Sequence, residues 1–165
     1  MEHGLGPEWA VWLQEGAIGR TMRASFLLYP LVNVLHILGF TALAGGILAV
    51  DLRLLGLGRR LALDQVARIM LPVALVGLAV AVPTGALLFI TEAVGMWNNP
   101  VFGWKVGIIA LAGANALALH AGPWRRVAEW GAPGAKLPAS ARAAGAASLV
   151  FWMGALILGR LIAYF

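Results

Sequence analysis

Two histidines are the residues of this chain best suited to chemistry, because both lie in apolar segments. His36 lies inside the uncharged stretch 26–50, and His120 lies near the end of a second uncharged run, 106–124. Neutral imidazole is a common ligand of haem iron and also carries protons near neutral pH. An imidazole near the middle of a membrane span is costly unless a partner binds it. His36 is therefore the first candidate for a functional residue.

The composition indicates an integral membrane protein. Apolar residues make up 61% of the 165 residues and charged residues only 12%, and the mean hydropathy is +0.87, which is outside the range of soluble domains. The chain has no cysteine, so disulfides, thiolate-held iron–sulfur clusters and thioether-linked haem are excluded. Any redox cofactor must therefore be held without a covalent bond.

Four apolar stretches predict four transmembrane helices: 26–50, 69–91, 106–124, and 143–159 with 161–165 after it. Backbone groups in lipid must pair within their own segment, and about 20 helical residues cross a hydrocarbon layer of about 30 Å. The segment 7–23 carries Trp9 and Trp12 on one side and predicts a short helix in the membrane interface. We therefore expect an all-α integral membrane protein with an N-terminal interfacial segment, residues 1–25, and a four-helix transmembrane bundle, residues 26–165.

The basic residues predict the orientation. One group lies between the first two spans and a second between the last two: Arg53, Arg59, Arg60 and Arg68, then Arg125, Arg126, Lys136 and Arg142. Short loops rich in arginine and lysine remain in the cytoplasm, so we expect a multi-pass protein of a bacterial inner membrane with both termini periplasmic. The net charge of +5 does not indicate nucleic-acid binding, because these bases flank apolar spans.

Small residues and helix-end charges have structural explanations. Two stripes with a period of four, Gly77-Ala81-Gly85 and Ala110-Ala114-Ala118, predict close approach of the second and third spans to their neighbours. At the end of the first span, Asp51 and Arg53 are expected to form an ion pair.

A four-helix bundle with one histidine on each of two helices suggests b-type haem bound between them. Helix rise places His36 about 15 Å into the membrane from residue 26 and His120 about 27 Å from residue 102. One iron bound to both imidazoles would therefore require a helix shift, tilt or kink, for which Pro30 is a possible source.

Other residues at matching depths extend the candidate site. Met153 lies near the level of His36 and Met70 near that of His120, and methionine can complete the coordination of haem iron. Lys105 and Arg160 lie outward of His36, where their charges suit haem propionates or lipid head groups. The predicted site therefore has His36 and His120 as iron ligands and Lys105 and Arg160 as further cofactor-binding residues.

Several segments together resemble a family of uncharacterised bacterial four-span membrane proteins. They are Tyr29-Pro30 with His36, Asp51-Leu52-Arg53-Leu54-Leu55-Gly56, Asn115 to His120, Arg125 to Trp130, and Gly159-Arg160 with Ala163-Tyr164. The resemblance covers most of the chain from Arg23 to Tyr164, and it implies architecture more firmly than activity. More distantly, the plan is similar to copper-resistance membrane proteins and small b-type cytochromes, in which bundle histidines hold haem. By position, that resemblance gives this role to His36 and His120.

Three functions are compatible with these features. The leading hypothesis is a haem b-binding membrane protein or small cytochrome-like electron-transfer subunit. The second is a proton- or ion-coupled transporter that acts as an oligomer and uses Asn33, His36, Glu92, Lys105 and Arg160. The third is an accessory or scaffold subunit of a larger membrane complex. The lipid bilayer is the one partner common to all three. The phosphate-loop, zinc-hydrolase and serine-nucleophile signatures are missing from the sequence, so we do not expect an independent enzyme.

Overall fold

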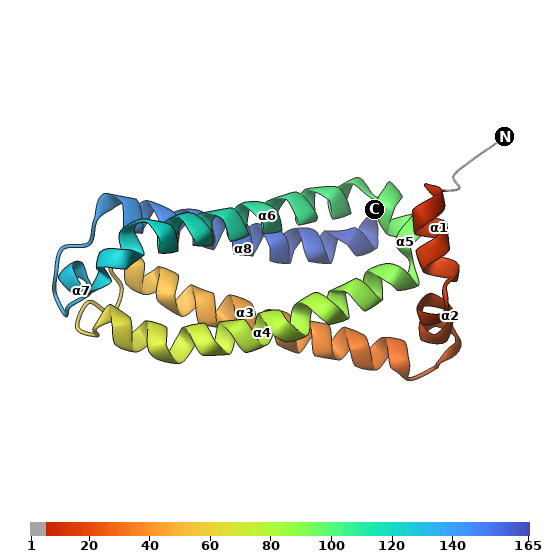
Figure 1. Ribbon diagram of the computed structural model, residues 1–165, viewed down its shortest axis with the longest axis horizontal. Coiled ribbons are helices and arrows are strands. Elements are labelled where there is room, and N and C mark those ends of the chain that lie inside the picture. The colour runs from red at the N-terminus through yellow and green to blue at the C-terminus, as the bar shows by residue number, and fades with distance from the viewer. Residues whose placement is uncertain (1–5) are drawn as a thin grey trace.

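Four long helices dominate the structure, a computed structural model that describes residues 6–165. They are α3 (Leu28–Leu54), α4 (Leu63–Thr91), α6 (Pro100–Ala121) and α8 (Ala139–Leu161), and they run side by side along the molecule (Figure 1). Each belongs to a segment long and apolar enough to cross a membrane. The predicted all-α membrane bundle is confirmed. The first five residues of the predicted interfacial segment 1–25 lie outside the described part of the chain.

Short helices occupy the two ends of the bundle. At the end that holds the C-terminus, called the outer end below, lie α1 (Glu8–Glu15), α2 (Ala17–Ala24), α5 (Ala93–Asn98) and η2 (Ile162–Tyr164) (Figure 1). At the opposite, inner end lie η1 (Pro123–Arg126) and α7 (Val127–Trp130). The single helix predicted for residues 7–23 is two helices, because the backbone is extended at Gly16 (φ −66°, ψ 168°).

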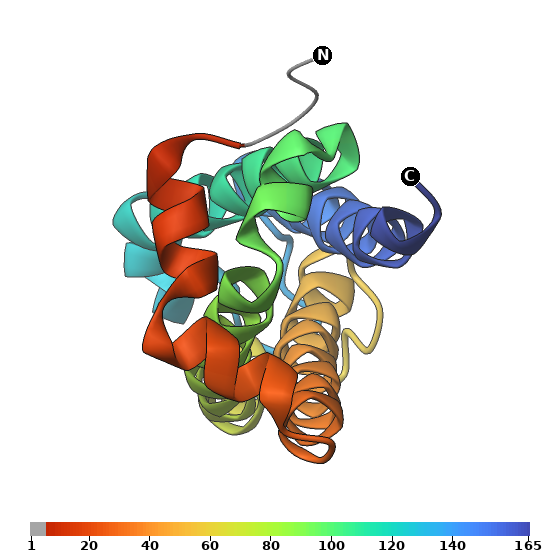
Figure 2. The ribbon, with the colours of Figure 1, turned by 90° about the vertical axis from the view of Figure 1, so that its right-hand side faces the viewer.

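The bundle consists of two helix pairs, α3 with α4 and α6 with α8, which are seen end-on in Figure 2. In the first pair the two backbones touch. A Cβ atom placed on Gly39 of α3 would lie 2.8 Å from the amide nitrogen of Ala81, and one placed on Gly77 of α4 would lie 2.6 Å from the carbonyl oxygen of Gly39. The predicted close approach of the second span through its small residues is therefore confirmed.

The corresponding prediction for α6 is wrong. Ala110, Ala114 and Ala118 are exposed, whereas Ala112 and Leu119 are buried. Asn115 points to the fourth span, and its Nδ2 donates a hydrogen bond to the carbonyl oxygen of Ala144 at 2.9 Å. A stripe of alanines permits close helix packing but serves equally well as a lipid-facing surface, so the spacing alone could not distinguish the two.

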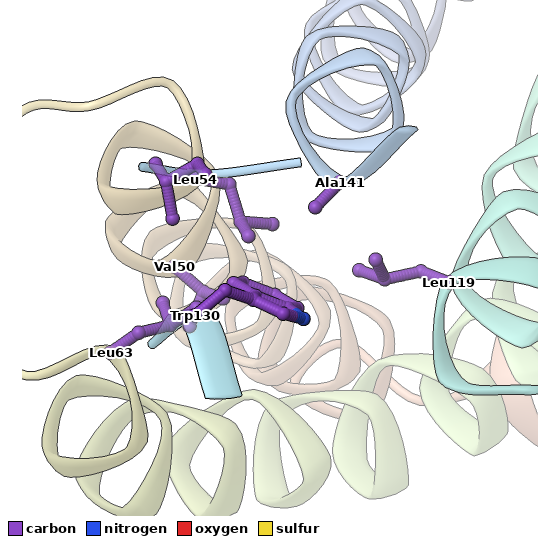
Figure 3. Close-up of a cluster of buried hydrophobic side chains, with 7 residues drawn as sticks. Val50, Leu54, Leu63, Leu119, Trp130 and Ala141 are labelled. Carbon is purple, nitrogen blue, oxygen red and sulfur yellow. The ribbon is translucent and has the colours of Figure 1, made fainter. Parts of the chain in front are cut away.

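A buried apolar cluster joins the two helix pairs at the inner end (Figure 3). Its members come from all four long helices and from the segment between the last two: Val50, Leu54, Leu63, Leu119, Trp130, Leu137 and Ala141. Trp130 is fixed within it, because its Nε1 donates to the carbonyl oxygen of Pro123 at 3.3 Å. The backbone amide of Leu63 donates to the carbonyl oxygen of Gly131 at 2.9 Å. These contacts fix the inner ends of the helices relative to one another.

At the outer end, α1 and α2 run across the end of α4 (Figures 1 and 2). Arg23 of α2 donates through Nη1 to the carbonyl oxygen of Thr91, the last residue of α4, and through Nη2 to Glu15, each at 3.0 Å. The last carbonyls of a helix lack intrahelical donors and carry partial negative charge, so a guanidinium is a suitable partner. Trp9 packs edge-on against Trp97 of α5 with ring centroids 4.9 Å apart.

Candidate functional site

His36 lies in the outer half of α3, eight residues or about 12 Å from the start of that helix. Its ring is half-buried against α4, and its Nδ1 atom lies 2.9 Å from the carbonyl oxygen of Ala81 and 3.2 Å from the Thr84 hydroxyl. A carbonyl can only accept a hydrogen bond, so this geometry assigns the proton of the neutral ring to Nδ1. Nε2 then keeps its lone pair, and it makes no hydrogen bond to any residue in 6–165.

The sequence Pro83-Thr84-Gly85 of α4 explains why the ring fits at this position. Pro83 has no amide hydrogen, so it leaves the carbonyl of Ala79 without its usual donor and loosens the helix locally. The Thr84 hydroxyl donates to the carbonyl oxygen of Val80 at 2.6 Å. At Gly85 a Cβ atom would lie only 2.9 Å from Cε1 of His36. The missing side chain of this glycine makes room for the imidazole.

Lys105 is the second basic group of this region and comes from the other helix pair. It is half-buried on α6, and its Nζ lies against α8, 3.5 Å from where a Cβ of Gly159 would be. His36 and Lys105 thus lie in the outer halves of α3 and α6, one on each helix pair.

The other two predicted site residues do not join them. Arg160 is exposed near the C-terminus, where it donates to the Tyr164 hydroxyl at 2.7 Å and lies 5.0 Å from the centre of that ring. His120 is exposed at the inner end of α6. Its Nδ1 lies 2.8 Å from the carbonyl oxygen of Ala116 on its own helix, and its ring centroid lies 5.3 Å from that of Trp124.

The two histidines cannot ligate one metal ion in this arrangement. Both α3 and α6 begin at the outer end (Figure 1), and His120 is 20 residues, or about 30 Å, along α6 compared with about 12 Å for His36 along α3. The helix shift that a shared iron would require is not present, so His36 and His120 lie at different levels of the bundle. Of the two methionines considered as further iron ligands, Met153 is 46% exposed on α8, and Met70 packs against the inner apolar cluster.

Two charged residues at the inner end of α3 are buried, which the sequence analysis did not predict. Asp51 and Arg53 are only 4% and 3% exposed, yet they do not form the expected ion pair. Residues two apart on a helix point in different directions, which explains the error. Arg53 donates through Nε to the carbonyl oxygen of Leu61 at 2.8 Å. Oδ2 of Asp51 and both Nη atoms of Arg53 find no partner among the described residues. The sequence did contain a signal for these two residues, because both belong to the Asp-Leu-Arg-Leu-Leu-Gly segment that contributes to the family resemblance.

Comparison of the chain with protein-family models, with curated proteins and with solved structures gave no match. The fold alone does not assign an activity, because four-helix bundles carry many unrelated functions. Function must therefore be inferred from the geometry of the residues themselves.

Proposed function

We propose that the protein binds haem b in the outer half of its bundle, with His36 as an axial ligand, and takes part in electron transfer within the membrane. One observation carries this proposal: Nδ1 of His36 is held by the carbonyl oxygen of Ala81, and Nε2 is left without a partner in the described structure. Metal-ligating histidines typically donate their other ring N–H to a carbonyl or carboxylate, which fixes the tautomer and the ring orientation.

The donor set fits haem better than a metal ion held by side chains alone. Within residues 6–165, no three His, Asp or Glu side chains come close enough to form a metal site. The porphyrin itself supplies four nitrogen ligands to haem iron, so the protein has to supply only one or two side-chain ligands. When bound, haem would supply a one-electron couple. Lys105, from the facing helix pair, would supply a positive charge for a haem propionate.

The test is an absorption spectrum of the detergent-solubilised protein, oxidised and reduced, purified from haem-replete cells. The wild type is expected to show a Soret band that His36→Ala removes, with Lys105→Gln weakening haem retention. Thr41→Ala is a matched control, because Thr41 lies on an exposed part of the same helix and its hydroxyl bonds only the Ile37 carbonyl. Wild-type protein without a Soret band would rule out the proposal.

A second candidate function is proton-coupled or ion-coupled transport by an oligomer. The presence of two titratable groups, His36 and Lys105, in the outer half of the bundle favours it, because ionisable residues within spans often mark proton or ion paths. If the protein is a transporter, reconstituted vesicles should show a pH-dependent flux that His36→Ala abolishes, and the protein should be colourless.

An accessory-subunit role predicts a different result on native gels. The protein should then migrate with a persistent heterologous partner, whereas an oligomeric transporter would migrate as a homo-oligomer.

We infer that the membrane is a bacterial inner membrane and that the inner end faces the cytoplasm. The support is the group of exposed arginines there, Arg59, Arg60, Arg125 and Arg126, since short basic loops stay in the cytoplasm. The C-terminus lies at the opposite end (Figure 1). Alkaline phosphatase fused after Phe165 should therefore be active in cells, and green fluorescent protein at the same position should be dark. Fluorescence from the green fluorescent protein fusion would show that the orientation is the opposite of the one inferred.

A further inference from the structure

We propose a second binding site, in a hollow between α3 and α8, that takes a lipophilic ammonium compound with Asp51 as its counter-charge. The hollow has a volume of about 240 Å³ and is lined mainly by Phe40, Leu48, Asp51, Leu149, Trp152 and Met153. His36 and Lys105 do not line it. The proposal therefore does not depend on haem binding.

The carboxyl group of Asp51 is the feature that points to a ligand. The residue is 4% exposed, and its Oδ2 atom is buried with no hydrogen-bond partner in the described part of the chain. The ion pairs among residues 6–165 do not include Asp51. Burying a carboxylate without a counter-charge is strongly unfavourable, so a cation bound in the hollow would relieve that cost.

The remaining walls favour a cation on an apolar body. Phe40 and Trp152 lie on opposite helices with ring centroids 6.2 Å apart and planes tilted by 58°. Aromatic faces attract ammonium groups, and tryptophan does so best. The other side chains of the wall, among them Leu48 and Leu149, are apolar except for Thr41, whose hydroxyl donates to the carbonyl oxygen of Ile37 on its own helix. An anion would meet the carboxylate of Asp51, apolar groups and a Thr41 hydroxyl whose proton is already donated to Ile37, so the hollow discriminates against it.

The hollow opens sideways, toward the surface that contacts lipid tails. Met153 and Leu156 at its rim are 46% and 49% exposed, and both lie within a membrane-spanning helix. A ligand must then enter from the bilayer, which requires an apolar tail. The volume is below the range of about 300–1,000 Å³ for sites that enclose a drug-sized molecule. We infer that the site holds the ammonium group and adjoining carbons while the tail remains in the lipid.

Equilibrium dialysis tests this proposal, with the full chain in nanodiscs of zwitterionic phosphatidylcholine and two matched probes. The first probe is 4-phenylbutyl-trimethylammonium, and the second is its uncharged analogue with carbon in place of nitrogen. The wild type is expected to bind the cation saturably and at least tenfold more tightly than the neutral analogue. Asp51→Asn should weaken cation binding at least tenfold and leave the neutral probe unaffected. Asp64→Asn, at an exposed carboxylate near the start of α4, is the matched control and should change neither.

A second variant keeps the proposal falsifiable if Asp51→Asn fails to fold. Leu149→Trp would fill the hollow and leave the carboxyl group in place, and it should abolish saturable binding of the cation. The proposal would be overturned if the two probes bound equally. It would also be overturned if cation binding were unchanged in Asp51→Asn or in Leu149→Trp. Either result would indicate that a lipid acyl chain occupies the hollow. His36→Ala should retain cation binding, so the failure of one proposal is distinguishable from the failure of the other.

Discussion

The Nδ1 atom of His36 on α3 lies 2.9 Å from the carbonyl oxygen of Ala81 on α4. This contact joins the two helices close to the point where Gly39 meets the backbone of α4. The acceptor is a main-chain oxygen, whose position is fixed by the helix itself and not by a side-chain rotamer. The orientation of the imidazole is therefore set by the packing of α3 on α4, and changes in that packing should be visible at the ring.

Gly85→Ala should displace the imidazole without unfolding the protein. The new Cβ would lie 2.9 Å from Cε1 of His36, so the ring must move and its bond to Ala81 is lost, at a cost of about 0.5–1.5 kcal/mol. The higher helix propensity of alanine, worth up to about 1 kcal/mol, offsets this cost. NMR spectra of protein labelled at the histidine ring nitrogens should show a changed His36 signal with nearly unchanged thermal stability, and the Soret band should weaken.

The control for this variant is Gly113→Ala on α6, where a Cβ would meet nothing within 4 Å. It should leave the His36 signal and the Soret band unaltered. A Gly85→Ala protein with a wild-type His36 signal would contradict the packing described for the ring.

His120→Ala should have almost no effect. The side chain is exposed, and its Nδ1 bonds only the carbonyl of Ala116 one turn earlier in the same helix. Surface substitutions of this kind change the free energy of unfolding by about 0.5 kcal/mol or less. The absorption spectrum of the variant should match the wild type. If His120→Ala removed the Soret band as His36→Ala is expected to do, the separation of the two histidines would be wrong.

Trp130→Ala should destabilise the bundle strongly. Trp130 is 8% exposed, lies in the inner apolar cluster and bonds Pro123 through its indole nitrogen. Truncating a buried tryptophan typically lowers the free energy of unfolding by about 3–5 kcal/mol. Denaturant titration in detergent micelles measures this loss. Trp104→Ala is the matched control, since Trp104 on α6 is 73% exposed, and a similar loss in both variants would contradict the assignment of the core.

Arg23→Gln should loosen the short helices at the outer end. The change removes the donor to the Thr91 carbonyl and the ion pair with Glu15, which together are worth about 1 kcal/mol. Hydrogen exchange of α1 and α2 should become faster while that of the inner half of α4 stays the same. Arg20→Gln removes an exposed guanidinium from the same helix and serves as the control. Equal exchange in the two variants would show that Arg23 does not hold these helices in place.

Hydropathy predicted the four spans well, because each is far more apolar than the loops that separate them. It placed their ends less well: α4 begins at Leu63 and not at residue 69, since its first two turns carry Asp64, Gln65 and Arg68. Helical hydrogen bonding continues beyond the apolar part of a span, and polar residues at the membrane surface do not interrupt it.

The orientation of each helix about its axis could not be predicted from the sequence. In a soluble bundle the apolar face of a helix identifies the core, but a span is apolar on all sides and this signal is lost. For this reason His36 and Lys105 could be placed in depth but not assigned contacts, and the stripe through Ala114 was assigned to the wrong face. Asp51 and Arg53 were wrongly paired although their spacing already argued against a direct contact.

The backbone contact of α3 with α4 at Gly39 and Gly77 also bears on how this protein can diverge. Since the main chain aligns these two helices, the many leucines and valines on their lipid-facing sides can be exchanged among apolar types without moving the imidazole. Distant homologues would then retain little overall identity. What they should share is the spacing of a few small residues around one histidine, and a search pattern built on that spacing would be a better way to find them than alignment of whole sequences.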